Sequence, residues 1–212
     1  MAFTAKDVQA LREKTGVGMM DCKKALVASD GDMDKAIDFL REKGLAAATK
    51  KASRIAAEGV VLAYYDESKK VGVVVEVNSE TDFVAKNEKF VSFVSDIAKT
   101  IVETAPADVD ALNATKLVGS DKTVEEMRQE LVLAIGENMK VRRFERVEGQ
   151  IATYIHGGGT VGVLVQFDTD DATAATDAFK AMGKDVAMQI AAMNPMAIDE
   201  DGISEEVKQQ EI

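Results

Sequence analysis

The sequence predicts an α+β protein in which a small helical bundle precedes two related units with antiparallel strands. Helical periodicity runs through residues 1–53, and it changes to strand-like periodicity after Gly59. The pattern of two strands followed by a helix then recurs later in the chain. We therefore expect three units, which cover residues 1–53, 54–145 and 146–212.

The first unit is expected to form three short helices with tight turns. Thr4 begins a capping box at the start of the first helix, and the glycine-rich turn at 15–18 separates the first two helices. Asp32 caps the third helix, which we expect to end at Gly44. The Ala-rich basic stretch 45–59 that follows is either a continued helix or a linker.

The second unit begins with a predicted hairpin. The runs VVLAYY (60–65) and VGVVVEV (71–77) are rich in β-branched residues, and they flank the polar turn DESKK (66–70). A helix is expected next, because five apolar residues fall on one helical face: Phe90, Val94, Ile97, Ala98 and Ile101. Pro106 ends this region.

The rest of the second unit contains a polar stretch and one more helix. Residues 107–122 are polar, and we predict a loop there. Thr123 and Glu126 match a second capping box. The helix that begins there is expected to stop at Gly136.

A duplication is indicated by four matches in the same order. They pair Gly149 with Gly59 and Gly162 with Gly72 at an offset of 90 (149 − 59), and Phe179 with Phe90 and Pro195 with Pro106 at an offset of 89 (195 − 106). One residue is therefore missing between strand and helix in the second copy. Since a two-strand hairpin cannot bury a face alone, each copy needs its helix or its twin.

Composition excludes several classes of function. The 26 basic and 37 acidic residues give a net charge of −11, which argues against direct binding to nucleic acid or to acidic membranes. A single cysteine, Cys22, excludes an internal disulfide and is typical of a reducing compartment. The chain start lacks the apolar run of a signal peptide, and no stretch has the length of a membrane span. We expect a cytoplasmic protein.

Few residues are available for catalysis or metal binding. A nucleophile pair of Cys22 with the sole histidine, His156, leaves a hydrolase hypothesis open, but one Cys and one His are too few for a zinc cluster. GGGTVG (157–162) matches a dinucleotide-binding pattern, but it leads into a strand where that pattern requires a helix, so we interpret it as a hairpin loop. We predict no catalytic residue, no cofactor and no metal.

Two apolar features allow more than one interpretation. Met19 and Met20 begin a helix, where they either cover the bundle core or contact a partner protein. Phe83 follows Asp82 directly after a predicted strand. If the next helix began early, Phe83 would lie seven residues before Phe90 and share its buried face, so periodicity alone favours a buried Phe83.

Four stretches resemble one protein family. LREKTGVGMMDCKKAL (11–26) and ETDFVAKN (80–87) resemble the two hallmark segments of bacterial elongation factor Ts, and AIGENMKVRR (134–143) and HGGGTVGVLV (156–165) resemble two further stretches of that family. They occur in the family's order, and the resemblance extends to about residue 207. It implies a ubiquitin-associated-like N-terminal bundle and a core of two related subdomains.

The resemblance also implies a function without covalent chemistry. The family promotes release of GDP from the translation GTPase elongation factor Tu, so its members are exchange factors. By resemblance, Asp82 and Phe83, flanked by Thr81 and Val84, form a tip that enters the partner's GTPase domain near its magnesium site. The alternative is a binding module that uses the bundle to recognise a ubiquitin-like or helical partner, without exchange activity.

Further contacts are implied more weakly. Met19 and Met20 would contact a helix of the same GTPase domain, and Ile135 and His156 match positions near the partner's nucleotide-binding side. For His156, a local hydrogen bond within the hairpin is the alternative. The core would contact the partner's other domains.

The end of the chain carries two expectations. Ser204 caps a short helix at which the sequence stops. Many family members continue beyond this point with a helical hairpin and further core segments, so the resemblance implies an incomplete third unit and leaves self-association open. In the second copy no aromatic residue lies between Phe167 and Phe179, so we expect it to lack a counterpart of the tip.

Overall fold

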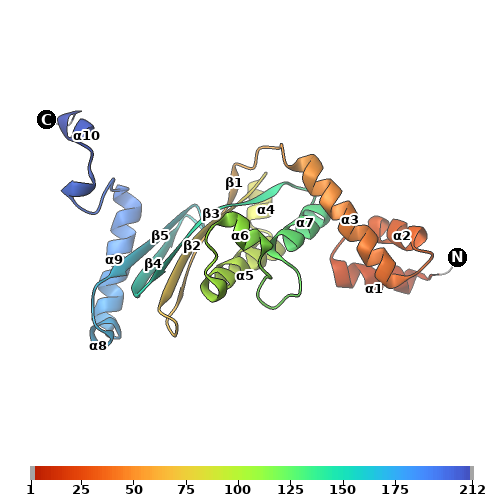
Figure 1. Ribbon diagram of the computed structural model, residues 1–212, viewed down its shortest axis with the longest axis horizontal. Helices are drawn as coiled ribbons and strands as arrows, with labels where there is room; N and C mark the ends of the chain where they lie inside the picture. Colours follow the sequence, from red (N-terminus) through yellow and green to blue (C-terminus); the bar gives the residue numbers. More distant parts are fainter. Residues whose placement is uncertain (1–2, 211–212) are drawn as a thin grey trace.

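The computed structural model describes residues 3–210 and shows an elongated arrangement of helices and antiparallel sheets (Figure 1). The bundle lies at one end, a three-stranded sheet with its helices lies in the middle, and a two-stranded sheet with one long helix lies at the other end (Figure 1). The predicted α+β class is confirmed. Within residues 3–210, no helix has the length and apolar character needed to cross a membrane.

The predicted three-helix bundle is confirmed as α1 (Ala5–Thr15), α2 (Met19–Ala28) and α3 (Met33–Lys51). Thr4 caps α1 with a complete capping box, since its hydroxyl faces the Asp7 N–H and the Asp7 carboxylate accepts from the Thr4 N–H. The bundle has its own apolar core, built from Val8, Leu11, Val17, Cys22, Ala25, Leu26, Ala36 and Leu40.

The third helix does not end at Gly44, and this prediction is wrong. α3 continues to Lys51, and Gly44 is buried where α3 packs on α7 (Val124–Ile135). A Cβ atom at residue 44 would lie 3.3 Å from the backbone oxygen of Gln129. Gly44 therefore allows two helices to approach closely, and this contact joins the bundle to the rest of the molecule.

The central sheet is built on the predicted hairpin. β1 (Glu58–Asp66) and β2 (Val71–Ser79) pair in antiparallel register. Alternate residues of β2 are buried under α5 (Glu88–Thr104) and its neighbours, among them Val71, Val73, Val75 and Val77. α5 contributes the apolar face that its periodicity predicts, including a fully buried Phe90. This cluster is the main core of the molecule.

A third strand, β3 (Met139–Glu148), pairs with the free edge of β2 and was not predicted. Its sequence MKVRRFERVE is rich in charge, and Met139 and Val141 are its buried residues. An edge strand whose side chains mostly face solvent carries little apolar alternation, so periodicity could not indicate it. The predicted boundary at residue 145 falls within β3, and the three-unit division stays a proposal.

The predicted loop at 107–122 contains a short helix, α6 (Val109–Ala114), so the loop prediction is wrong there. Asp108 caps α6 by accepting a hydrogen bond of 2.8 Å from the Ala111 N–H, and Leu112 is fully buried. One buried leucine fixes this turn of helix in a stretch that is otherwise polar. α7 follows with the predicted capping box at Thr123 and a left-handed cap at Gly136.

The predicted recurrence of two strands and a helix is confirmed, because these elements occur twice in the same order. β1, β2, α4 and α5 correspond to β4 (Gln150–His156), β5 (Val161–Phe167), α8 (Asp171–Ala174) and α9 (Asp177–Met193), where α4 is Asp82–Ala85. The long helices of both copies end on a non-glycine residue with φ of 45°, which is Ala105 in the first copy and Asn194 in the second.

The two copies pack against each other through equivalent glycines. A Cβ atom at Gly72 would lie 2.8 Å from Cγ2 of Ile151, and one at Gly162 would lie 2.5 Å from Cγ1 of Val61. Side chains of each copy therefore occupy the space above the glycine of the other. The absence of two side chains lets the sheets approach closely.

The long helix of the second copy buries fewer residues than the long helix of the first copy. Within the described chain α9 buries Gly183 and Ala187, whereas α5 buries residues along its whole length. α9 lies along β4 and β5 (Figure 1). A 3₁₀ turn (Glu200–Gly202) and α10 (Glu205–Gln210) follow, and Ser204 begins α10 as predicted by accepting from the Val207 N–H at 3.4 Å.

Candidate functional site

The most distinctive surface feature is the short segment 81–86, which we call the tip. It follows β2 directly and contains the one-turn helix α4 (Asp82–Ala85). Thr81 caps α4, because its hydroxyl accepts a hydrogen bond of 3.5 Å from the Val84 N–H. Asn87 then caps α5, so the two helices are separate.

Phe83 points into solvent while its neighbour is anchored. Its side chain is 81% exposed, whereas Val84 is 5% exposed and belongs to the main core. The burial of Phe83 that periodicity favoured is wrong, because the break between α4 and α5 takes Phe83 out of register with Phe90. Phe83 is more exposed than Phe90 and than the half-buried Phe179.

The charged residues of the tip pair with each other. Lys86 donates a hydrogen bond of 2.8 Å to Asp82 across one helical turn. This hydrogen bond lowers the pKa of Asp82 below its ordinary value and raises the pKa of Lys86. The carboxylate of Asp82 therefore stays charged at neutral pH, next to the exposed ring of Phe83.

A second segment of the chain, which contains Glu137, contacts the tip at Thr81. Glu137, which follows the C-cap Gly136 of α7, accepts hydrogen bonds from both the N–H and the hydroxyl of Thr81, at 3.0 and 2.7 Å. Glu137 was not predicted from the sequence. It lies 56 residues beyond Thr81, and no local pattern connects the two positions.

Met19 and Met20 are exposed at the start of α2, by 43% and 63% of their side chains. The interpretation that both cover the bundle core is therefore wrong. Gly18 precedes them at the N-cap, where a Cβ atom would meet nothing within 4 Å. The two methionines begin α2. Figure 1 shows α2 in the bundle, apart from α4 of the tip.

Ile135 and His156 occupy different settings. Ile135 ends α7 and packs, half-buried, against the main core. His156 is exposed at the end of β4, and its Nδ1 atom lies 3.1 Å from the Tyr154 hydroxyl, so the local hydrogen bond considered for it is present. The turn after His156 connects β4 to β5, which confirms a hairpin loop in place of a dinucleotide site. Its Gly159 oxygen accepts from the Val61 N–H at 2.7 Å.

Cys22 and His156 are not brought together. Cys22 is buried in the bundle, where its thiol donates to the Val17 oxygen at 3.5 Å, and burial raises its pKa. His156 lies in the hairpin of the second copy. The arrangement gives the hydrolase hypothesis no nucleophile and base in contact.

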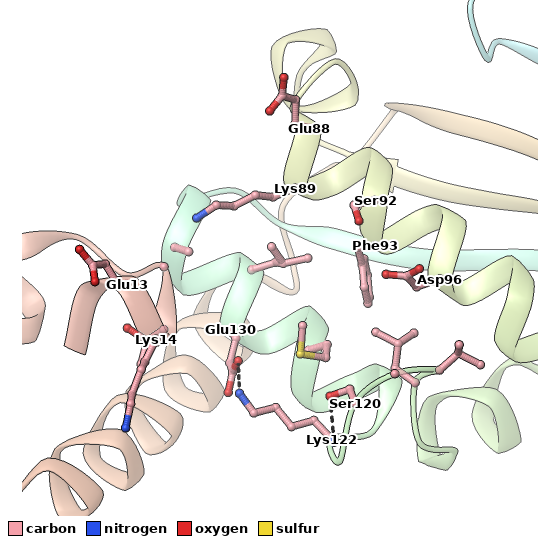
Figure 2. A pocket seen from close by; sticks show the side chains of 18 residues that line it. Glu13, Lys14, Glu88, Lys89, Ser92, Phe93, Asp96, Ser120, Lys122 and Glu130 are labelled. Carbon is pink, nitrogen blue, oxygen red and sulfur yellow. Dashed lines mark hydrogen bonds and ion pairs between the residues drawn. The ribbon is translucent and has the colours of Figure 1, made fainter. Parts of the chain in front are cut away.

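A cleft of about 630 Å³ lies between the bundle and the core, and Figure 2 shows its lining. Lys122 and Glu130 form an ion pair of 2.6 Å at its edge, and Phe93 lies at its apolar side (Figure 2). None of the predicted site residues lines it. Within residues 3–210, no group of three or more His, Cys, Asp or Glu side chains is placed to hold a metal ion.

Comparison with known proteins identifies a matching protein family and several similar proteins. A family model described as "Elongation factor TS" matches residues 80–212. "Elongation factor Ts" of Clostridium perfringens (strain 13 / Type A) is 51% identical over 212 residues, which cover 99% of this chain and 69% of the relative. The proteins of the same name from Clostridium novyi (strain NT) and Syntrophotalea carbinolica are 50% and 48% identical and cover 98% and 100% of this chain.

These relatives are longer than the chain, which spans 68% of the Clostridium novyi protein and 69% of the Syntrophotalea carbinolica protein. The match nevertheless includes the bundle, the tip and both copies of the repeat, because it covers almost the whole chain. The chain belongs to the elongation factor Ts family of translation elongation factors.

Proposed function

We propose that this protein promotes release of GDP from elongation factor Tu, and that the tip enters the partner's GTPase domain near its magnesium and nucleotide site. The observation that supports this most is the 81% exposure of Phe83 beside the anchored Val84. An apolar side chain left in water forgoes about 1.5–3 kcal/mol of burial free energy. Burial of the Phe83 ring inside the opened partner gives that exposure a reason.

The proposed activity needs no covalent chemistry. A factor that weakens GDP binding must itself be bound less tightly when GDP is present, by the same coupling free energy. The factor must therefore make contacts that are available only in the conformation that lacks nucleotide. A tip that fits an opened nucleotide site supplies such contacts, without a nucleophile, a cofactor or a metal of its own.

The remaining predicted residues have supporting roles in this proposal. Met19 and Met20 contribute affinity from the ubiquitin-associated-like bundle, because flexible exposed methionines adapt to an apolar partner surface. Ile135 and His156 lie toward the nucleotide-binding side of the partner, and the rest of the core contacts its other domains. The protein acts in the cytoplasm, together with elongation factor Tu.

The test is release of fluorescent GDP from elongation factor Tu with the wild type and with Phe83→Ala. Release should slow about ten- to a hundredfold, since each factor of ten corresponds to about 1.4 kcal/mol of lost differential binding. The melting temperature of Phe83→Ala should match the wild type, because no core contact is removed.

Phe90→Ala is the matched control for this test. Its ring is fully buried, so truncation should cost about 3–5 kcal/mol of unfolding free energy. If Phe83→Ala melts like Phe90→Ala, Phe83 is a core residue and the proposal fails. Unchanged GDP release at micromolar wild-type protein would instead favour a binding module without exchange activity.

A further inference from the structure

We propose that Glu137 is a positioning residue for the tip, and that its contact with Thr81 fixes the direction in which Phe83 projects. This inference rests on the proposed function, because the direction of Phe83 matters only if its ring enters a partner. Glu137 itself is half-buried.

The contact uses both oxygens of the carboxylate. Oε2 accepts from the Thr81 N–H at 3.0 Å, and Oε1 accepts from the Thr81 hydroxyl at 2.7 Å. The same hydroxyl accepts from the Val84 N–H at 3.5 Å. A hydroxyl has one hydrogen to donate and two lone pairs, so both bonds form together. Glu137 therefore orients the hydroxyl that caps α4.

A helix as short as α4 needs such external support. It has four residues, and a single helical turn fixes many dihedral angles for very few hydrogen bonds. Val84 anchors one side of this turn in the core, and the Glu137 contact anchors its N-cap residue, Thr81, from another part of the chain. Phe83 lies between these two fixed points.

A reciprocal contact strengthens the arrangement. Glu80 accepts from the Asn138 N–H at 2.5 Å, so each of the two adjacent segments, 80–81 and 137–138, supplies a carboxylate to a backbone N–H of the other. The Asn138 amide, 5% exposed, also donates to the Arg54 oxygen at 2.9 Å. The crossed contacts thereby tie the base of the tip to the chain that enters β1.

Basic residues accompany these two carboxylates. Arg54 lies 3.5 Å from Glu80. Burial lowers the pKa of Lys51, and the nearby charges of Glu80 and Glu137 act in the opposite direction. The carboxylates are thus surrounded by donors and positive charge, which suits a permanent structural contact.

The physical consequence is a tip that is ordered before it meets a partner. A rigid tip loses less conformational entropy on binding than a mobile one. More of its contact free energy then remains to favour the opened nucleotide site. Loss of the Glu137 contact should therefore affect the exchange step itself, rather than only the affinity of the complex.

The experiment combines two readouts on the full chain with Glu137→Ala. Amide hydrogen exchange of Thr81 and Val84 should accelerate at least about tenfold in the free protein, because both N–H groups depend on this contact. GDP release from elongation factor Tu at saturating factor should slow by about three- to tenfold, which is less than the full effect of a lost charged hydrogen bond, because Glu137 positions the tip and does not itself touch the partner.

Three further variants sharpen the test. Glu137→Gln retains one acceptor oxygen, so both effects should be intermediate. Thr81→Val should accelerate hydrogen exchange of the Val84 amide. In the Thr81→Val background, Glu137→Ala should slow GDP release less than it does in the wild-type background, because its hydroxyl partner is already absent. Glu145→Ala, which changes an exposed glutamate of β3, should behave like the wild type in both readouts.

The outcomes separate this inference from the proposed function. Unchanged amide exchange in Glu137→Ala overturns the inference whatever GDP release does. Glu137→Ala could instead show faster amide exchange and unchanged GDP release, while Phe83→Ala releases GDP slowly. This result overturns the role of Glu137 in the exchange step. If Phe83→Ala itself releases GDP as fast as the wild type, the proposed function of the tip fails, and the exchange role of Glu137 fails with it.

Discussion

Neighbouring residues of the tip have opposite surroundings, and this contrast defines what each can do. Val84 is held in the main core, whereas Phe83, one position earlier, is almost fully exposed. Asp82 is exposed too, but its carboxylate accepts a hydrogen bond from Lys86. Among these side chains, Phe83 is the one with a large apolar surface left for a partner.

Met19 and Met20 lead to a prediction about affinity. They lie in the bundle and not at the tip, so their contacts should form whether or not the nucleotide site has opened. Changing both to Ala should raise the factor concentration for half-maximal GDP release, with less effect on the rate at saturation. A titration of GDP release against factor concentration measures both quantities. A double variant that saturates normally but releases GDP far more slowly would contradict this division.

The site could be predicted only in part from sequence. Resemblance indicated the residues of the tip, whereas periodicity favoured a buried Phe83, because it could not detect the break between α4 and α5. Glu137 was missed for a different reason. Its partner Thr81 is distant in sequence, and a contact between an ordinary glutamate and an ordinary threonine has no pattern of its own.

At the scale of elements, one ion pair joins two helices of the bundle. Lys43 of α3 donates to Asp21 of α2 at 2.5 Å, and this hydrogen bond lowers the pKa of Asp21 below its ordinary value of 3.8. A carboxyl group with a lowered folded pKa contributes stability that is present above the unfolded value and lost as the pH falls through the folded one. The contact should therefore stabilise the bundle at neutral pH and weaken below about pH 4.

Asp21→Asn tests this contribution. The variant should be less stable than the wild type at pH 7, and the difference in unfolding free energy should shrink as the pH is lowered below about 4. Urea unfolding followed at several pH values measures it. Asp34→Asn, an exposed change on α3, serves as control. A difference that stays constant down to acid pH would show that the Asp21 charge contributes nothing.

Helices and strands could be predicted where one of their faces is buried, because apolar residues then recur at regular spacing in the sequence. The apolar face of α5 and the paired hairpins were found, because their side chains alternate between core and solvent. β3 was missed, since most of its side chains face solvent. At Gly44 the usual stop signal was wrong, because the glycine is needed for contact with another helix, which only the tertiary structure reveals.

For the whole molecule, the duplication has produced two similar copies with different surfaces. The offset of 89 (171 − 82) between α4 and α8 aligns Asp171 with Asp82 and Ala172 with Phe83. Asp171 is engaged by Lys70 at 2.5 Å and by Gln150 at 2.7 Å. These contacts hold α8 close to the β1–β2 turn, at the end of the molecule away from the bundle (Figure 1). The second copy thus keeps the turn of the tip and lacks its aromatic side chain.

This difference leads to a prediction about where the activity resides. Placing a Phe at the equivalent position, in the double variant Phe83→Ala/Ala172→Phe, should not restore GDP release, because α8 lies at the end of the molecule opposite the bundle (Figure 1). Ala172 is exposed, so the new ring should leave the melting temperature near that of Phe83→Ala. The measurement is GDP release from elongation factor Tu for the wild type, Phe83→Ala, Ala172→Phe and the double variant. Ala172→Phe alone should match the wild type. Recovery of release in the double variant would mean that either copy can act, and that the location of the tip in the first copy is not required.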